Sequence, residues 1–309
     1  MAHQPLRSAR LLDQVRERIR YAHYSIRTEK TYVYRVRFFI KFHQLRHPKD
    51  MGAREVQAFL SFLANERKVA PSTHRQALAA ILYLYKEVLD IQLLWMDEIG
   101  RPKQRVHIPV VLSRAEVAAL LDSLDESHLL ICQLLYGAGL RLMECLSLRV
   151  KDLDFDRKTI VVRHGKGAKD RVVMLPACLA DPLRAQLAQS RSIWAADRAS
   201  RIAGVWLPDA LARKYPRAGE SWSWHWVFPS PTLSTDPRTS IQRRHHQYEQ
   251  TVGRVLARAV VKAQIPKKVT AHTLRHSCRH GQSSGSAAVR PRSSQSPQPS
   301  LRHLTPTLG

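Results

Sequence analysis

The chain has 309 residues, of which 44% are hydrophobic, which is enough for one large or two ordinary domains with packed cores. Its 50 lysines and arginines against 25 aspartates and glutamates give a formal net charge of +25. This excess disfavours an ordinary soluble surface and indicates a polyanionic partner, for which nucleic acid is the natural candidate.

The four cysteines form no C-x-x-C pair, which argues against a zinc knuckle or a dithiol redox site. The longest apolar stretch, Leu129 to Leu140, is too short to span a bilayer, and the N-terminus lacks an apolar signal core. We therefore expect a cytoplasmic protein that makes no membrane contact.

Residues 9–92 show helical periodicity. Apolar residues recur three and four positions apart in four segments, at 11–22, 32–40, 56–63 and 77–88, and Pro71 is typical of a helix start. The pattern predicts a compact bundle of four antiparallel helices. Each basic residue on its polar faces is by itself expected to be merely solvated, but the set, given the net charge, indicates DNA contact. The set comprises Arg27, Lys30, Arg35, Arg37, Lys41, Arg67, Lys68 and Arg75.

Residues 93–111 are predicted to be a linker between two domains. The run from Gly100 to Pro109 has two prolines, four basic residues and no periodicity. A second domain is then expected over residues 112–280.

The second domain opens with a predicted capping box from Ser113 to Glu116, followed by an apolar helix face. A second helix is expected from about residue 128 to 136, and the glycines of residues 137–139 should end it. Arg141 then falls in the first turn of a mostly apolar helix. A charge there is costly unless it is paired or faces a ligand, and Glu144, three residues on, is its natural partner.

A β-hairpin is predicted next, with strands at 159–164 and 171–175. Lys166 lies at its tip between two glycines, which would let the backbone approach a ligand closely. Taken alone, a lysine at this position is commonly a solvated turn residue.

Residues 180–265 contain a predicted short helix within 207–216 and then Trp222, Trp224 and Trp226 in alternation. Alternation at period two predicts an extended segment with all three rings on one side. They would be either core or a stacking platform for unpaired bases. The basic run at residues 243–246 favours nucleic acid for at least one of them.

The stretch from Ala271 to Ser277 brings two histidines and an arginine together. If it is helical, His272, Arg275 and His276 share one face. The arginine's planar fork suits phosphate oxygens, and a neighbouring histidine can donate a hydrogen bond or move a proton.

Arg141 in Gly-Leu-Arg-Leu-Met-Glu, Lys166 on the hairpin and His272-x-x-Arg275 follow a helical bundle in that order. Over residues 9–278 the chain thereby resembles the tyrosine recombinases, or phage-type integrases. The resemblance implies a mainly α fold with a small β-hairpin or sheet: an N-terminal helical bundle (a SAM-like core-binding domain) and a mixed α+β catalytic domain, here lacking its last helices. It also implies that a tyrosine attacks a DNA phosphodiester and forms a 3′-phosphotyrosyl bond, with no metal or nucleotide cofactor.

Several residues take roles from this resemblance. Arg141 and Arg275 would stabilise charge on the phosphate oxygens. Lys166 matches the general acid that protonates the leaving oxygen, and His272 would assist proton transfer. Glu144 would orient the pocket from behind.

Residues of about 195–246 look like the insert that distinguishes integron integrases. The similar stretches are Ala210–Pro216, Val227–Ser230, Asp236–Arg238 and Arg243–His246. The resemblance implies a bacterial, nucleoid-associated protein that recombines a duplex attachment site with a folded single-strand cassette site. Extrahelical bases of that strand would be contacted at the matching positions, which are Trp224, Pro237, His245 and His246. The family also implies a homo-oligomer on DNA.

The pattern departs from the family after residue 277. The family places a Leu-Gly-His segment and then the nucleophilic tyrosine after His-x-x-Arg, whereas the last tyrosine here is Tyr248. The composition of residues 281–309 predicts a disordered tail, and the abrupt change near Cys278 leads us to hypothesise a frameshift there. The chain is then expected to bind DNA but to be defective in strand cleavage and in oligomer assembly.

Three alternatives to this reading remain open. One is a non-catalytic DNA-binding protein that occupies attachment sites. Another is an active recombinase that uses an unrecognised tyrosine or one supplied by a partner. The third is a metal site formed by His272, His276, Cys278 and His280, whose spacing we regard as coincidental.

Overall fold

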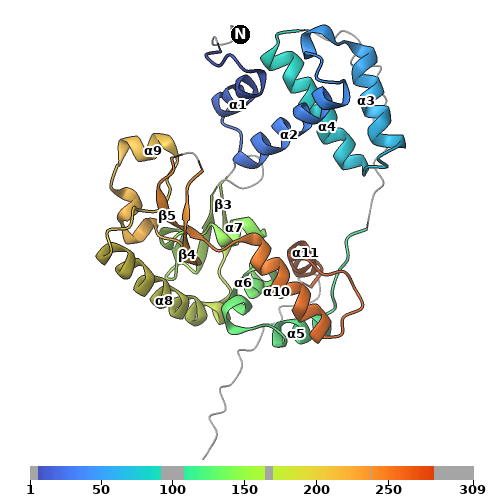
Figure 1. Cartoon of the computed structure of the whole chain (residues 1–309). Coiled ribbons are helices and arrows are strands. Elements are labelled where there is room, and N and C mark those ends of the chain that lie inside the picture. Colours follow the sequence, from blue (N-terminus) through green and yellow to red (C-terminus); the bar gives the residue numbers. More distant parts are fainter. Residues whose placement is uncertain (1–5, 92–107, 164–169, 238, 282–309) are drawn as a thin grey trace, which may run out of the picture. The chain divides into compact units, whose positions relative to one another are not determined.

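A computed structural model describes residues 6–91, 108–163, 170–237 and 239–281, apart from the side chains of Asp209, Arg279 and His280 (Figure 1). The chain divides into two compact units, residues 1–107 and 108–309. Within the described ranges, every helix is too short or too polar to cross a membrane. The predicted linker, 93–111, and the predicted tail, 281–309, lie almost wholly outside these ranges.

The first unit contains the four predicted helices. They are α1 (Leu11–Tyr21), α2 (Ile26–Phe42), α3 (Ala53–Asn65) and α4 (Pro71–Tyr83), with a 3-10 turn at Pro48–Asp50 and a π-helical turn at Leu84–Val88 that prolongs α4. Side-chain hydrogen bonds stabilise the N-termini of α2 and α3. Ser25 Oγ accepts from the Thr28 amide at 3.1 Å, and Glu55 accepts from the Gly52 amide at 2.8 Å.

The core of the first unit has two parts that meet on α2. Phe39 packs with Phe59 of α3 and Tyr85 after α4, whereas Val33 and Val36 pack against α1. Burying each large apolar side chain contributes about 1.5–3 kcal/mol. The apolar faces of the helices pack against one another inside the unit. Six basic side chains of these helices are exposed, those of Arg20, Arg27, Lys30, Arg37, Lys41 and Arg54, whereas Arg18 of α1 is 7% exposed.

The second unit is a mixed α+β domain. Its helices are α5 (Arg114–Asp122), α6 (Glu126–Gly137), α7 (Leu142–Leu146), α8 (Ala180–Ala199), α9 (Asp209–Lys214), α10 (Glu249–Lys262) and α11 (Ala271–Gly281). Four 3-10 turns lie at Val150–Asp152, Ala177–Leu179, Ala218–Glu220 and Trp222–Trp224. One antiparallel sheet has the order β1 (Leu153–Asp154), β2 (Thr159–Val162), β3 (Arg171–Met174), and a second pairs β4 (Pro229–Thr235) with β5 (Gln242–His246). The mainly α fold with small sheets, predicted from the sequence, is confirmed.

One apolar core joins most of these elements. Leu120 of α5, Leu134 of α6, Ile160 of β2, Leu256 of α10 and Leu274 of α11 all belong to it and are almost fully buried. The capping box is present, because Ser113 Oγ accepts from the Glu116 amide and Glu116 accepts from the Ser113 amide. The predicted hairpin is also present in β2 and β3, with Ile160 opposite Val173.

One prediction about the insert is wrong. The tryptophan segment is not extended, because hydrogen bonds from Trp224 N to Ser221 O and from His225 N to Trp222 O close a 3-10 turn. Its rings therefore do not share one side. The hairpin of β4 and β5, which also lies within residues 195–246, was not predicted from the sequence.

Candidate phosphate and DNA site

The turn between α6 and α7 positions Arg141. Gly139 adopts a left-handed conformation, with φ of 63°, and ends α6. Arg141 is then the N-cap of α7: its amide donates to Glu144 Oε2 at 2.8 Å and its Nη1 donates to Glu144 Oε1 at 2.5 Å. The pairing of Arg141 with Glu144 anticipated from their spacing is confirmed.

Glu144 also binds a second arginine, Arg171, which starts β3. Its Nη1 and Nη2 donate to Glu144 Oε1 and Oε2 at 2.8 and 2.6 Å in a bidentate pair. Burial alone would raise the pKa of Glu144, but the hydrogen bonds from Arg171 and Arg141 outweigh it and lower that pKa to about 2. Glu144 is therefore a buried anion that fixes two guanidinium groups.

Arg171 was missed by sequence reasoning, although a signal existed. Along β3 the side chains of Arg171 and Val173 lie half-buried, while those of Val172 and Met174 are exposed. Alternation in the predicted strand thus places Arg171 on the inward face, where a charge requires a partner.

Arg275 reaches the same turn from the other end of the domain. Its Nε donates to the Gly139 carbonyl at 2.9 Å, two residues before Arg141. Fully buried Leu274 and Ser277 hold α11 in place, the latter because its Oγ accepts from the Leu112 amide at 2.9 Å and donates to Thr273 O. Both predicted phosphate-binding arginines therefore lie at the turn formed by residues 139–141.

Of the two other predicted catalytic residues, the structure describes His272 alone. His272 is exposed on α11, and its ring lies 6.5 Å from that of His276. Lys166 lies outside the described residues, as does the side chain of His280. Within the described residues no cluster of three metal-binding side chains occurs.

Trp224 stands beside a basic groove in the insert. The groove has a volume of about 720 Å³ and is lined by Lys214, Tyr215, Pro216, Arg217, Ala218 and Trp224. Lys151 Nζ lies 2.9 Å from the centroid of the Trp224 ring, a cation–π contact on the half-buried indole. Pro237 is exposed between β4 and β5.

Arg149 ties this tryptophan to the segment that follows α7. Its guanidinium donates to the carbonyls of Trp224 and Trp206 at 2.6 and 2.9 Å and lies 3.8 Å from the centroid of the Trp226 ring. Burial lowers the pKa of Arg149 to about 10, which leaves it charged at neutral pH. Arg149 was not singled out from the sequence.

His245 and His246 pack around Trp226. Their ring centroids lie 5.7 and 5.2 Å from that of the indole, and Trp226 Nε1 donates to Arg244 O. Burial lowers the pKa of both histidines, that of His246 to about 4, so both are neutral at pH 7. Trp226 is 4% exposed and belongs to the interior, whereas Trp222 contacts Trp194 and Arg191 instead.

Family models match both units of the chain. The model described as Phage integrase, N-terminal SAM-like domain, matches residues 11–95, and that of the Phage integrase family matches residues 110–280. The chain belongs to the phage integrase family of tyrosine recombinases. The second match runs through Arg141, Glu144, Arg171 and Arg275.

Relatives agree with this assignment. An integrase/recombinase of Escherichia coli is 59% identical over 261 residues, which is 84% of this chain and 77% of the relative. Tyrosine recombinase XerA of Thermococcus kodakarensis is 40% identical over 168 residues, 53% of this chain and 56% of the relative. A solved structure of a lambda integrase (75–356) dimer bound to a COC′ core site shares the fold, with a TM-score of 0.56, 14% identity and coverage of 87% of each chain. For the structure of XerH bound to its difH substrate, the TM-score is 0.53 and the sequence identity is 18%, over 88% of this chain and 74% of XerH.

Proposed function

We propose that this chain binds recombination-site DNA and holds one backbone phosphate at the turn between α6 and α7. The observation that carries the proposal is the convergence of Arg141 and Arg275 on residues 139–141, from elements far apart in sequence. Two guanidinium groups fixed from behind suit the non-bridging oxygens of a phosphodiester. Family membership and the net charge of +25 support DNA as the ligand.

Each side chain has a part in this site. Glu144 holds Arg141 through its side chain and backbone, so that the arginine is oriented before DNA arrives. Arg171, which starts β3, donates to the same carboxylate and balances its negative charge. Exposed His272 would hold the phosphate and assist proton transfer, and Lys166 would protonate the leaving 5′ oxygen.

These 309 residues contain no tyrosine after Tyr248. The family resemblance places the attacking tyrosine after His272-x-x-Arg275. We therefore propose that the residues present bind and position a phosphate without supplying the attacking hydroxyl. This favours a second candidate function, a non-catalytic DNA-binding protein that occupies attachment sites.

A nicked suicide attachment site separates the possibilities. After incubation, a native gel should show retarded DNA, and a denaturing gel should show no covalent protein–DNA band. A covalent band would contradict the non-cleaving proposal and point to an unrecognised or partner-supplied tyrosine. Absence of retardation at low salt would overturn DNA binding itself.

Arg141→Gln combined with Arg275→Gln should weaken retardation, because two phosphate ligands are removed.

We further propose an integron-type specificity, in which the insert receives extrahelical bases of a folded single strand. The groove beside Trp224 supports this, since an indole flanked by cations offers a stacking surface for any base. Half-buried His245 and exposed Pro237 would add contacts that carry no charge. His246, which is 8% exposed, would support Trp226 from the interior. A homo-oligomer on the DNA is the expected assembly.

A matched pair of hairpins tests this specificity. One carries unpaired bases in its stem and the other is fully paired, with the same length and flanks. The bulged hairpin should bind roughly tenfold more tightly, and Trp224→Ala should remove the difference, because one stacked base is worth about 1–3 kcal/mol. Equal affinity of the unmodified protein for both hairpins would refute the integron-type assignment.

A further inference from the structure

Trp206 is a surface tryptophan in the insert that belongs to none of the predicted motifs. Its side chain is 40% exposed. With the residues that the structure describes, its indole makes no hydrogen bond, ring contact or cation–π contact. The other tryptophans of the described ranges each contact an aromatic ring or a cation, namely Trp194, Trp222, Trp224 and Trp226. An exposed indole that the fold does not use is a candidate contact for a partner.

The main chain just before Trp206 is held from two sides. On one side, Arg243 Nη1 donates to the Gly204 carbonyl at 2.6 Å. On the other side, the Val205 amide donates to the Gly219 carbonyl at 2.9 Å. The two backbones approach so closely that a Cβ added to Gly204 would lie 2.4 Å from the carbonyl carbon of Gly219. This segment is therefore fixed by contacts that leave no room for a side chain at Gly204.

Trp206 stands outward from this fixed segment. Its neighbours Val205 and Leu207 are 3% and 5% exposed, so they face the interior while the indole faces solvent. Arg149 Nη2 donates to the Trp206 carbonyl at 2.9 Å and fixes the main chain at the residue itself. A ligand that contacts the indole therefore has little backbone to order, which favours binding.

Two contacts place the main chain of Trp206 beside the groove that contains Trp224. The guanidinium of Arg149 donates to the carbonyls of both tryptophans. Gly219, whose carbonyl accepts from the residue before Trp206, directly follows Ala218 of the groove lining. The Trp206 side chain is not part of that lining. The two indoles therefore offer separate surfaces in the same part of the insert.

The charge of this part of the insert suits nucleic acid. Arg213, Lys214 and Arg217 are all exposed. An unpaired base has a phosphate on each side, so an aromatic face among cations complements both the base and its backbone. The apolar side chain of a protein partner would not require these cations.

We propose that Trp206 stacks on a second unpaired base of the strand whose first unpaired base lies against Trp224. The inference deepens the proposed function and rests on its integron-type specificity. The exposed indole face accepts any base by stacking, and its N–H donates to a base or phosphate oxygen. Folded strands with two unpaired bases are then preferred to strands with one.

Hairpins with one and with two unpaired bases test this site on the full-length chain. The first unpaired base keeps one position, and the second is moved stepwise along the same strand. The best two-base hairpin should bind about tenfold more tightly than the one-base hairpin, because a stacked base contributes a factor of this size. Trp206→Ala should abolish this gain and leave the preference for the one-base hairpin over a fully paired hairpin unchanged.

Fluorescence reports the stacking directly. 2-Aminopurine placed as the second unpaired base should be quenched when the unmodified protein binds and should stay bright with Trp206→Ala. Trp206→Phe keeps an aromatic ring and should retain most of the gain in affinity. The main-chain carbonyl that accepts from Arg149 is present in every variant, and equal melting temperatures would show that the variants are folded.

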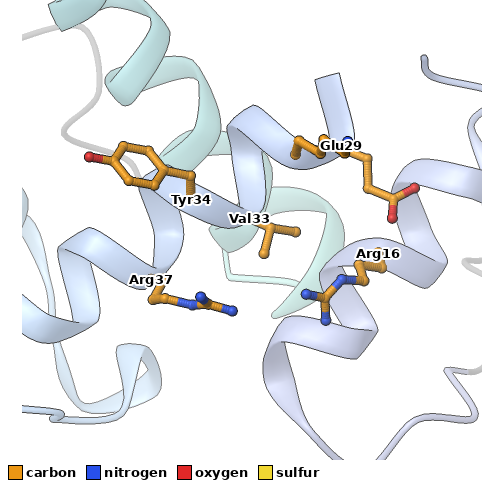
Figure 2. Close-up of a pocket in the computed structure, with 6 residues that line it drawn as sticks. Arg16, Glu29, Val33, Tyr34 and Arg37 are labelled. Carbon is orange, nitrogen blue, oxygen red and sulfur yellow. The ribbon is translucent and has the colours of Figure 1, made fainter. Parts of the chain in front are cut away.

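Tyr34→Ala is the matched control for the loss of an exposed aromatic ring. Tyr34 is 58% exposed on α2 of the first unit, and Figure 2 shows its ring projecting away from Arg16 and Arg37. This substitution should leave the gain from the second unpaired base unchanged, because Tyr34 lies outside the insert.

The outcomes separate this site from the proposed function. A gain that survives Trp206→Ala, or no gain at any position of the second base, would overturn the site at Trp206. If Trp206→Ala changes the sedimentation of the DNA-free chain and not the gain, the indole serves a protein contact and the base assignment is wrong. Absence of the one-base preference, with Trp206-dependent quenching intact, would refute the integron-type specificity at Trp224 and leave the site at Trp206 standing.

Discussion

Glu144 connects two arginines that the chain supplies from different elements. Because its pKa falls from 4.5 to about 2 on folding, its charge stabilises the folded state fully above about pH 4.5. That contribution, about 3 kcal/mol, is lost as pH falls toward 2. We predict that Glu144→Gln is less stable than the unmodified protein at pH 7 and that the difference shrinks on acidification.

Urea denaturation at a series of pH values measures this difference. Asp181→Asn serves as the control, because the Asp181 side chain is 91% exposed and its pair with Arg184 should contribute little at any pH. A pH-independent difference for Glu144→Gln would show that shape, not charge, matters at this position.

Arg149 is a buried cation whose partners are two main-chain carbonyls and an indole face. Lysine keeps the charge but lacks the planar fork, so Arg149→Lys leaves a carbonyl without its donor. We predict a loss of about 2 kcal/mol in the free energy of unfolding. Arg157→Lys, at a side chain that is 85% exposed, should change it by less than about 0.5 kcal/mol. Equal effects would contradict the role given to Arg149.

At the scale of elements, β4, β5 and the turn at Trp222–Trp224 enclose histidines that fold in the neutral form. Burial lowers the pKa of His225 and His246 from 6.5 to about 4. The unfolded chain therefore binds protons that the folded chain does not, between about pH 6.5 and 4. Each histidine therefore makes its full contribution to the free energy of unfolding above pH 6.5. On acidification below that value, the free energy of unfolding falls by about 1.4 kcal/mol per pH unit for each histidine.

The variant His246→Gln should flatten this pH dependence. Tryptophan fluorescence follows the transition, because five of the six tryptophans lie beyond residue 193. His23→Asn removes an exposed histidine of the first unit and should leave the slope unchanged. A slope that survives His246→Gln undiminished would mean that His246 is not neutral in the folded protein.

At the scale of the whole molecule, the net charge of +25 predicts that DNA affinity depends steeply on salt. Each phosphate contact releases counterions, and for 6–10 contacts affinity falls roughly 10³- to 10⁵-fold between about 50 and 200 mM salt. Retardation of attachment-site and unrelated duplexes over this range measures the effect. A shallow slope for both duplexes would contradict an extensive phosphate interface.

Local patterns in the sequence were sufficient for much of the fold. Helical periodicity marked α1 to α4, the Ser113 capping box marked the start of α5, and strand alternation marked β2 and β3. Such signals depend on residues a few positions apart, so they survive without tertiary information. The order of the motifs could also be recognised in the sequence, with Arg141 first, then the hairpin and then His272-x-x-Arg275. This order indicated the family that the comparisons established.

Only the tertiary structure decided which side chains meet. Arg171 joins Glu144 from 27 residues away, Arg149 reaches the Trp224 carbonyl across 75, and Arg275 reaches the Gly139 carbonyl across 136. The tryptophan segment looked extended because alternation of five residues is compatible with more than one backbone. Long-range hydrogen bonds to Arg149 and Val150 fix it as a turn, and those partners follow from how the core packs, which no local period encodes.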